Sequence, residues 1–97
     1  LDILHQVKIM NLLQNLVEDL KLTIILTLHD LNLASEYCDK LILMNKGTIY
    51  STGKPEEVLT YENIEEVYKT VVVTLTNPLS KKPFISIVSE KILKKYL

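Results

Sequence analysis

The chain has 97 residues, with 11 Lys+Arg against 12 Asp+Glu and a formal charge of -1. This length allows one small domain at most, and the near-neutral charge argues against the basic surface that nucleic-acid binders usually show. Hydrophobic residues make up 47% of the sequence, which is ordinary for a globular protein, and no apolar run approaches the roughly 20 residues that span a bilayer.

The first third of the chain predicts a helix followed by a buried strand. From Ile3 to Leu20 apolar residues recur at steps of three and four, which indicates an amphipathic helix with Asp2 as its N-cap. Residues 23–28, TIILTL, form a continuous β-branched and apolar run that is typical of a strand buried on both faces of a parallel sheet. The strands that would flank it do not precede it, so we expect an incomplete sheet, and the start at Leu1 rather than Met leads us to expect a fragment.

Cap and turn residues predict four short elements in the middle of the chain. They are a helix over residues 31–38 capped by Asp30, a hairpin over residues 41–51 that turns at Gly47, a helix that begins at Pro55, and a helix over residues 62–68 capped by Thr60.

The last third changes character. Residues 70–76 and 84–88 are strand-like and are joined by a loop with two prolines, which predicts an antiparallel hairpin, and residues 89–97 favour a terminal helix. We therefore predict an α/β fold with one central parallel-type strand, flanking helices and antiparallel hairpins. We expect residues 1–69 to form the α/β part and residues 70–97 to be appended strands and a tail.

His29 is the best candidate for chemistry, because it follows directly on the predicted central strand. Open α/β sheets bind ligands in the crevice outside the carboxyl ends of their strands. An imidazole in that position can donate a hydrogen bond to a phosphate oxygen or position a water molecule. A histidine that only satisfies backbone groups at a strand end explains the position equally well.

The remaining polar residues predict no second site. His5, Asp30, Cys38 and Asp39 show no spacing known for metal ligands, so we expect no metal. The lysines near the C-terminus, Lys91, Lys94 and Lys95, suit a solvated helix face. The adjacent acidic pairs, Glu56-Glu57 and Glu65-Glu66, would point about 100° apart on a helix and so form no acid/base pair. The motifs GxxxxGK[ST], GxGxxG and GxSxG do not occur, so we expect no autonomous enzyme.

Three stretches together resemble the ATPase subunits of ABC transporters. They are Leu1-Asp2-Ile3 with His5-Gln6, TLHDLNLA at residues 27–34, and Tyr37-Cys38-Asp39. The longer run HDLNLASEYCDKLILMNKGTIYSTGKPEEVLTYENIEEVY, residues 29–68, is similar to the branch that energises uptake of iron(III) siderophores, haem and cobalamin. The resemblance runs from Leu1 to about Val88 and implies part of the P-loop NTPase core that these ATPases share.

The resemblance also implies roles for two residues. Asp2 matches the end of the D-loop, whose aspartate helps to couple two ATP sites across a dimer. His29 matches the switch histidine of the H-loop, which contacts the γ-phosphate of ATP and helps to position the attacking water. Phosphoryl transfer needs donors of this kind, aimed at the charge that develops on the γ-phosphate. A complete subunit would use ATP and Mg²⁺, form a homodimer, and bind a permease at the cytoplasmic face of the cell membrane.

Other parts of the family pattern would lie before Leu1. These are the Walker A loop, the Q-loop, the LSGGQ-type signature, the Walker B strand with its catalytic Glu, and the helical subdomain that docks on the permease. We therefore expect an inactive C-terminal portion that binds no cofactor alone and that associates with the missing N-terminal half or with itself. Two alternatives stay open, a noncatalytic dimerisation or regulatory module and a small hydrolase that uses His29 and Asp30.

Overall fold

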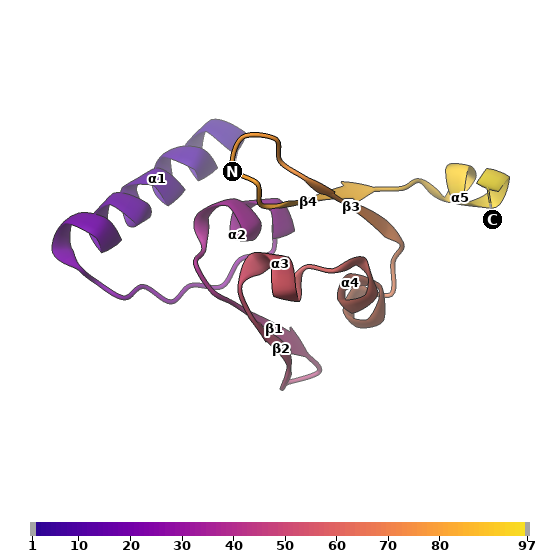
Figure 1. Cartoon of the computed structure of the whole chain (residues 1–97), viewed down its shortest axis with the longest axis horizontal. Coiled ribbons are helices and arrows are strands. Elements are labelled where there is room, and N and C mark those ends of the chain that lie inside the picture. Colours follow the sequence, from indigo (N-terminus) through magenta and orange to yellow (C-terminus); the bar gives the residue numbers. More distant parts are fainter. Residues whose placement is uncertain (1, 97) are drawn as a thin grey trace.

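The computed structural model describes residues 2–96, which extend over about 50 × 30 × 25 Å. The helices are α1 (Ile3–Leu20), α2 (Leu31–Tyr37), α3 (Pro55–Val58), α4 (Tyr61–Tyr68) and α5 (Glu90–Tyr96). The strands are β1 (Leu41–Asn45), β2 (Thr48–Gly53), β3 (Val72–Thr76) and β4 (Pro83–Ile87). Figure 1 shows α1 at one end of the molecule and α5 at the other, with the two hairpins and the short helices between them.

Helix α1 forms where the apolar spacing predicts it. Its N-cap is Asp2, whose side chain accepts a hydrogen bond from the backbone N–H of His5, and it ends at Lys21 in the left-handed conformation. The helix contacts α2, and its Met10 is buried, whereas Ile9 and Leu12 are exposed. The helix is therefore covered on only part of its apolar face.

The prediction of a central strand over residues 23–28 is wrong for this chain. The stretch forms neither helix nor strand, and Ile25 is 90% exposed. A parallel strand is stable only when neighbouring strands take up its backbone hydrogen bonds, and the strands that the structure describes pair only as β1–β2 and β3–β4. Figure 1 shows residues 21–30 as an extended connection between α1 and α2. The α/β class is confirmed, but both sheets are antiparallel hairpins.

Both predicted hairpins are confirmed. In the first, β1 pairs with β2 and the chain reverses at Lys46 and Gly47, which both have positive φ angles (50° and 80°). Two consecutive positive φ angles are characteristic of the type I′ turn, whose twist suits a two-residue hairpin loop. In the second, β3 pairs with β4 from Val72 opposite Ile87 to Thr76 opposite Pro83.

The short helices begin at the residues that the cap signals indicate. Asp30 caps α2, Pro55 opens α3, and the Thr60 side chain accepts a hydrogen bond from the N–H of Asn63 at the start of α4. A terminal helix, α5, is also present. None of the described helices has both the length and the hydropathy needed to cross a membrane.

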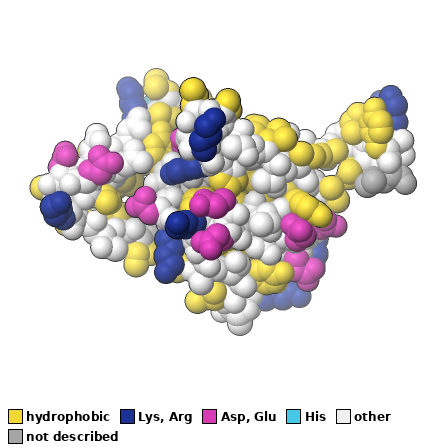
Figure 2. Space-filling model, in the orientation of Figure 1, with side chains coloured by type: hydrophobic (Ala, Val, Ile, Leu, Met, Phe, Trp, Pro, Cys, Tyr) yellow, Lys and Arg dark blue, Asp and Glu magenta, His cyan; other side chains and the backbone are white. Residues whose placement is uncertain are grey.

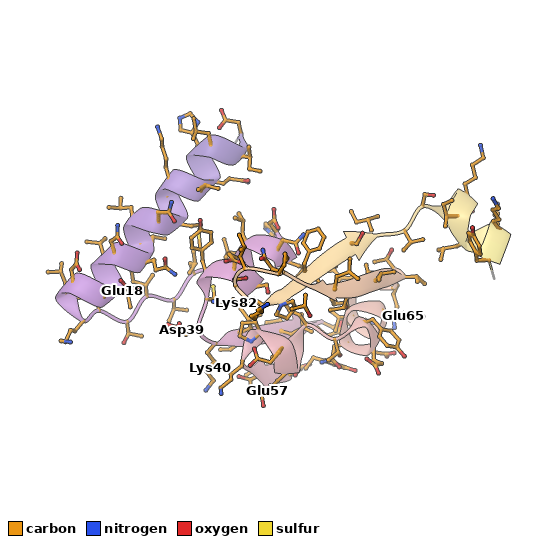
Figure 3. All side chains as sticks on the ribbon, turned by 45° about the horizontal axis from the view of Figure 1, so that its top comes forward. Glu18, Asp39, Lys40, Glu57, Glu65 and Lys82 are labelled. Carbon is orange, nitrogen blue, oxygen red and sulfur yellow. The ribbon has the colours of Figure 1, made fainter. Side chains whose placement is uncertain are left out.

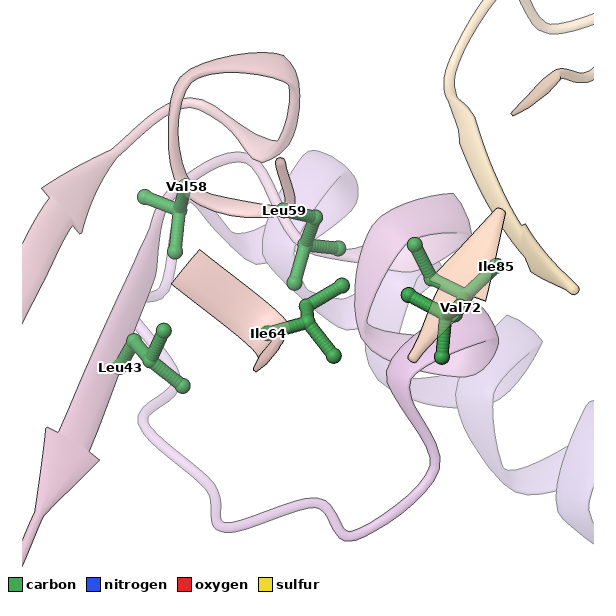
Figure 4. Close-up of a cluster of buried hydrophobic side chains, with 6 residues drawn as sticks. All are labelled: Leu43, Val58, Leu59, Ile64, Val72 and Ile85. Atoms are coloured by element: carbon green, nitrogen blue, oxygen red, sulfur yellow. The ribbon is translucent and has the colours of Figure 1, made fainter. Parts of the chain in front are cut away.

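The hydrophobic core is small and lies between the two hairpins. Figure 4 shows its six buried side chains, which come from β1, the α3–α4 region, β3 and β4: Leu43, Val58, Leu59, Ile64, Val72 and Ile85. Val72 and Ile85 follow residue 69 in the sequence and the other four precede it. Residues on both sides of this position therefore share one core. Many other apolar side chains remain at the surface in Figure 2.

Candidate functional site

His29 lies at a bend immediately before helix α2, and its side chain is exposed. The next residue, Asp30, is the N-cap, and its Oδ1 accepts hydrogen bonds from the backbone N–H groups of Asn32 (2.9 Å) and Leu33 (3.1 Å). Such a cap holds the first turn of a helix and fixes the direction of the chain that enters it. The backbone on the C-terminal side of His29 is therefore ordered, while the imidazole remains accessible.

Helix α2 is in turn fixed against β4. The side-chain amide of Asn32 donates to the backbone carbonyl of Ile85 (3.1 Å) and accepts from the N–H of the same residue (2.7 Å). Ser35, which is buried, donates from its hydroxyl to the carbonyl of Pro83 (2.6 Å). Sequence reasoning missed these contacts, and their only local signal is that polar residues 32, 35 and 36 share one face of α2.

Asp2, the second predicted site residue, acts in this chain as a helix cap. Its Oδ1 accepts from the backbone N–H of His5 (2.9 Å) and lies 3.0 Å from His5 Nδ1, and both side chains are largely exposed. Within residues 2–96 no hydrogen bond or ion pair joins Asp2 to His29. In the described part of the chain, Asp2 and His29 therefore do not form one site.

Several other titratable residues make contacts with near neighbours in the sequence. The Glu57 carboxylate accepts from the N–H of Lys54 (2.8 Å), and Glu66 lies 3.5 Å from Lys69 on an exposed surface. Lys94 pairs with Glu90 (3.2 Å) on α5. In the part of the chain that the structure describes, no three His, Cys, Asp or Glu side chains form a group that could hold a metal ion.

The thiol of Cys38 is poorly suited to nucleophilic chemistry. Burial raises its pKa, the neighbouring Asp39 carboxylate raises it further, and Lys82 offsets part of the effect. A raised pKa lowers the fraction of thiolate at neutral pH, and the thiolate is the reactive form. Figure 3 labels Asp39, in the connection between α2 and β1, and Lys82, in the loop before β4. Cys38 therefore adds no reactive group near α2.

A shallow hollow of about 330 Å³ lies beside α4 and β3. Its lining includes Tyr61, Thr74 and Lys81 but neither His29 nor Asp2. The Thr74 hydroxyl is buried without a hydrogen-bond partner. This hollow is therefore separate from His29, the residue that the family resemblance places at the γ-phosphate.

Comparison with known proteins identifies the relatives of the chain. It is 39% identical over 85 residues to the hemin import ATP-binding protein HmuV of Escherichia coli O157:H7. The aligned residues cover 88% of this chain and 33% of that protein. It is 39% identical over 84 residues to the petrobactin import ATP-binding protein FpuC of Bacillus anthracis, with 87% of this chain and 30% of that protein covered. A further relative is the petrobactin import ATP-binding protein YclP of Bacillus subtilis, 42% identical over 72 residues. The chain spans about a third of the length of these relatives.

A solved structure confirms the fold. A chain of a metal-chelate type ABC transporter in an inward-facing conformation matches with a TM-score of 0.80 at 21% identity, over 95% of this chain and 37% of that one. No family model matches. The fold is thus part of an ABC ATPase fold, and the chain is homologous to ATP-binding proteins of hemin and petrobactin importers.

Proposed function

We propose that this homologue of importer ATP-binding proteins is the C-terminal part of the subunit that binds and hydrolyses ATP in an ABC importer for an iron(III) siderophore, haem or cobalamin type of cargo. The observation that carries the proposal is the 39% identity over 88% of the chain to a hemin import ATP-binding protein. The 97-residue chain itself is proposed to be inactive, because no phosphate-binding loop occurs in it.

In the complete subunit, His29 would donate a hydrogen bond from its ring N–H to an oxygen of the ATP γ-phosphate. Phosphoryl transfer is accelerated mainly by groups that are held in place and directed at the charge on the transferred phosphate. The exposed ring of His29, next to the capped first turn of α2, suits this role. Asp2 is proposed to belong to the D-loop and to help couple two ATP sites.

ATP and Mg²⁺ would be bound mainly by residues outside this chain. Among the described residues, His29 is the proposed hydrogen-bond donor to the γ-phosphate, and no group of three His, Cys, Asp or Glu side chains could hold a metal ion. When bound, Mg²⁺ would neutralise phosphate charge during the transfer. The only group that this chain is proposed to supply to the nucleotide is the His29 imidazole.

In the importer, the chain would contact three partners at the membrane. The preceding part of the ATPase domain would pair with residues 23–28 and cover them, since Ile25 and Leu26 are exposed and carry unpaired backbone groups. Without it, the chain would self-associate through the same surface. A second ATP-binding subunit and a membrane permease would complete the importer at the cytoplasmic face of the membrane. Residues 1–69 would belong to the ATPase core, with residues 70–97 appended.

The test compares Mg²⁺-dependent ATP hydrolysis by two purified proteins, this chain and the complete subunit of the length that its relatives have. We expect the complete subunit to turn over ATP and the chain alone to show none. Turnover by the chain alone would favour a small hydrolase that uses His29 and Asp30. A folded complete protein that neither binds nor hydrolyses ATP would favour the alternative, a noncatalytic dimerisation or regulatory module.

A further inference from the structure

The outer edge of strand β4 is occupied by a helix instead of a third strand. In an antiparallel pair, alternate residues direct their backbone N–H and C=O groups away from the partner strand. On β4 these outward groups belong to Pro83, Ile85 and Ile87, and those of Pro83 and Ile85 bond to α2. Pro83 has no N–H, which suits a position on a sheet edge. Two of the three outward positions on this edge therefore hold α2.

Asn32 makes the central contact of this edge. Its side-chain amide presents one acceptor and one donor to the two backbone groups of Ile85, at 2.7 and 3.1 Å, as a neighbouring strand would. Alanine at this position would remove both hydrogen bonds and leave the backbone N–H and C=O of Ile85 without partners. Unsatisfied groups of this kind cost more free energy than the net gain from the bonds themselves.

A second set of contacts holds the C-terminal half of the same helix. The ammonium group of Lys82 donates to the backbone carbonyl of Glu36 (2.8 Å), and the hydroxyl of Ser80 donates to the Glu36 carboxylate (2.8 Å). Both donors lie in the loop between β3 and β4. Figure 3 shows Lys82 where this loop reaches the helix. The hairpin therefore holds α2 at two points about one turn apart, which restricts both its position and its rotation.

We propose that the β3–β4 hairpin positions His29, and that Asn32 is the positioning residue that transmits this placement. The inference rests on the proposed role of His29 at the ATP γ-phosphate. His29 is three residues before Asn32 and directly before the Asp30 cap, so a shift or rotation of α2 moves the point from which its ring projects. Catalytic groups must be placed within a fraction of an ångström, and a displacement of 1 Å can cost about 100-fold in rate.

The contact itself is tested in the 97-residue chain by amide hydrogen exchange, with Asn32→Ala compared to Asn63→Ala. Asn63 is a matched control because its side chain also donates to a backbone carbonyl, that of Val58 at 2.9 Å, but from helix α4. We expect Asn32→Ala to speed amide exchange at Ile85 and in α2 by at least about 10-fold relative to the unchanged chain. In Asn63→Ala, exchange at these positions should keep the rate of the unchanged chain. Equal exchange at Ile85 in the two variants would overturn the inference.

The consequence is tested in the complete subunit with the same two variants. Asn32→Ala should lower the kcat for ATP hydrolysis by about 10- to 100-fold with little change in the KM for ATP, while Asn63→Ala should keep the wild-type kcat below its unfolding temperature. Should Asn32→Ala fail to fold, Lys82→Met removes one hydrogen bond to α2 instead of two and should give a smaller loss of the same kind. A wild-type kcat in a folded Asn32→Ala or Lys82→Met protein would overturn the positioning role. The inference and the proposed function fail separately, because the latter fails if His29→Ala itself has no effect on kcat.

Discussion

Replacing His29 with alanine in the complete subunit lowers the kcat for ATP hydrolysis by about 100-fold or more and leaves the KM for ATP within about threefold, if this residue contacts the γ-phosphate. The reason is that a donor aimed at the transferred phosphate acts mainly on the transition state. Most of the nucleotide-binding energy would come from residues outside this chain. The kinetic constants are measured by steady-state phosphate release.

The same variant supplies its own control through ATP binding, which is measured by nucleotide displacement and should be nearly unchanged. His29→Gln keeps a side-chain N–H donor and should retain more turnover than His29→Ala. Wild-type kcat in His29→Ala, or a loss of ATP affinity as large as the loss of kcat, would contradict the proposed role. Because His29 is exposed and precedes α2, its substitution should not disturb the hydrophobic core.

Ile64→Ala is expected to produce the largest loss of stability in the 97-residue chain, about 3 kcal/mol in the free energy of unfolding. Ile64 is only 1% exposed and lies in the cluster of six side chains that joins the two hairpins. Truncation leaves a cavity that such a small core cannot close. Small domains have a total stability of only about 5–15 kcal/mol, so a large fraction would be lost. Urea denaturation followed by far-UV circular dichroism measures the change.

The control is Ile25→Ala, the same substitution at a residue that is 90% exposed. Its expected effect on the free energy of unfolding is within about 0.5 kcal/mol. A larger loss for Ile25→Ala than for Ile64→Ala would show that the core lies elsewhere, with residues 23–28 in a buried sheet.

Much of the fold could be predicted because its signals are local. Asp2, Asp30 and Thr60 each accept a hydrogen bond from an N–H two or three residues further on, so the cap and its helix are neighbours in the sequence. The turn at Gly47 is equally local, because its positive φ angle is a property of one residue and its neighbour.

Local sequence signals could not show that residues 23–28 form no strand in this chain. Its composition is that of a buried strand, but strand formation depends on partners that lie elsewhere in a chain. No such partner is available among residues 2–96, and the segment stays extended and unpaired. The apolar pattern suits a strand buried inside a sheet, whereas in this chain the segment is largely exposed and has no partner strand.

In the candidate site, too, the sequence indicates the local feature but not the long-range contacts. His29 could be selected from its place after an apolar run and from the resemblance of its surroundings to an H-loop. The contacts that hold α2 against β4 could not be predicted, because Asn32 and Ile85 are 53 residues apart and neither residue type signals a contact with the other. Contacts of this range depend on how the hairpin folds back on the helix.

Sequencing the DNA that precedes the codon of Leu1, in frame, would decide whether this chain belongs to an ATP-hydrolysing subunit. The relatives are about three times the length of this chain, so roughly two further chain lengths are expected. We expect a GxxxxGK[ST] loop, then an LSGGQ-like stretch, then an apolar strand that ends in Asp-Glu. A stop codon directly before Leu1, or an open frame without these motifs, would contradict the assignment to an ATP-hydrolysing subunit.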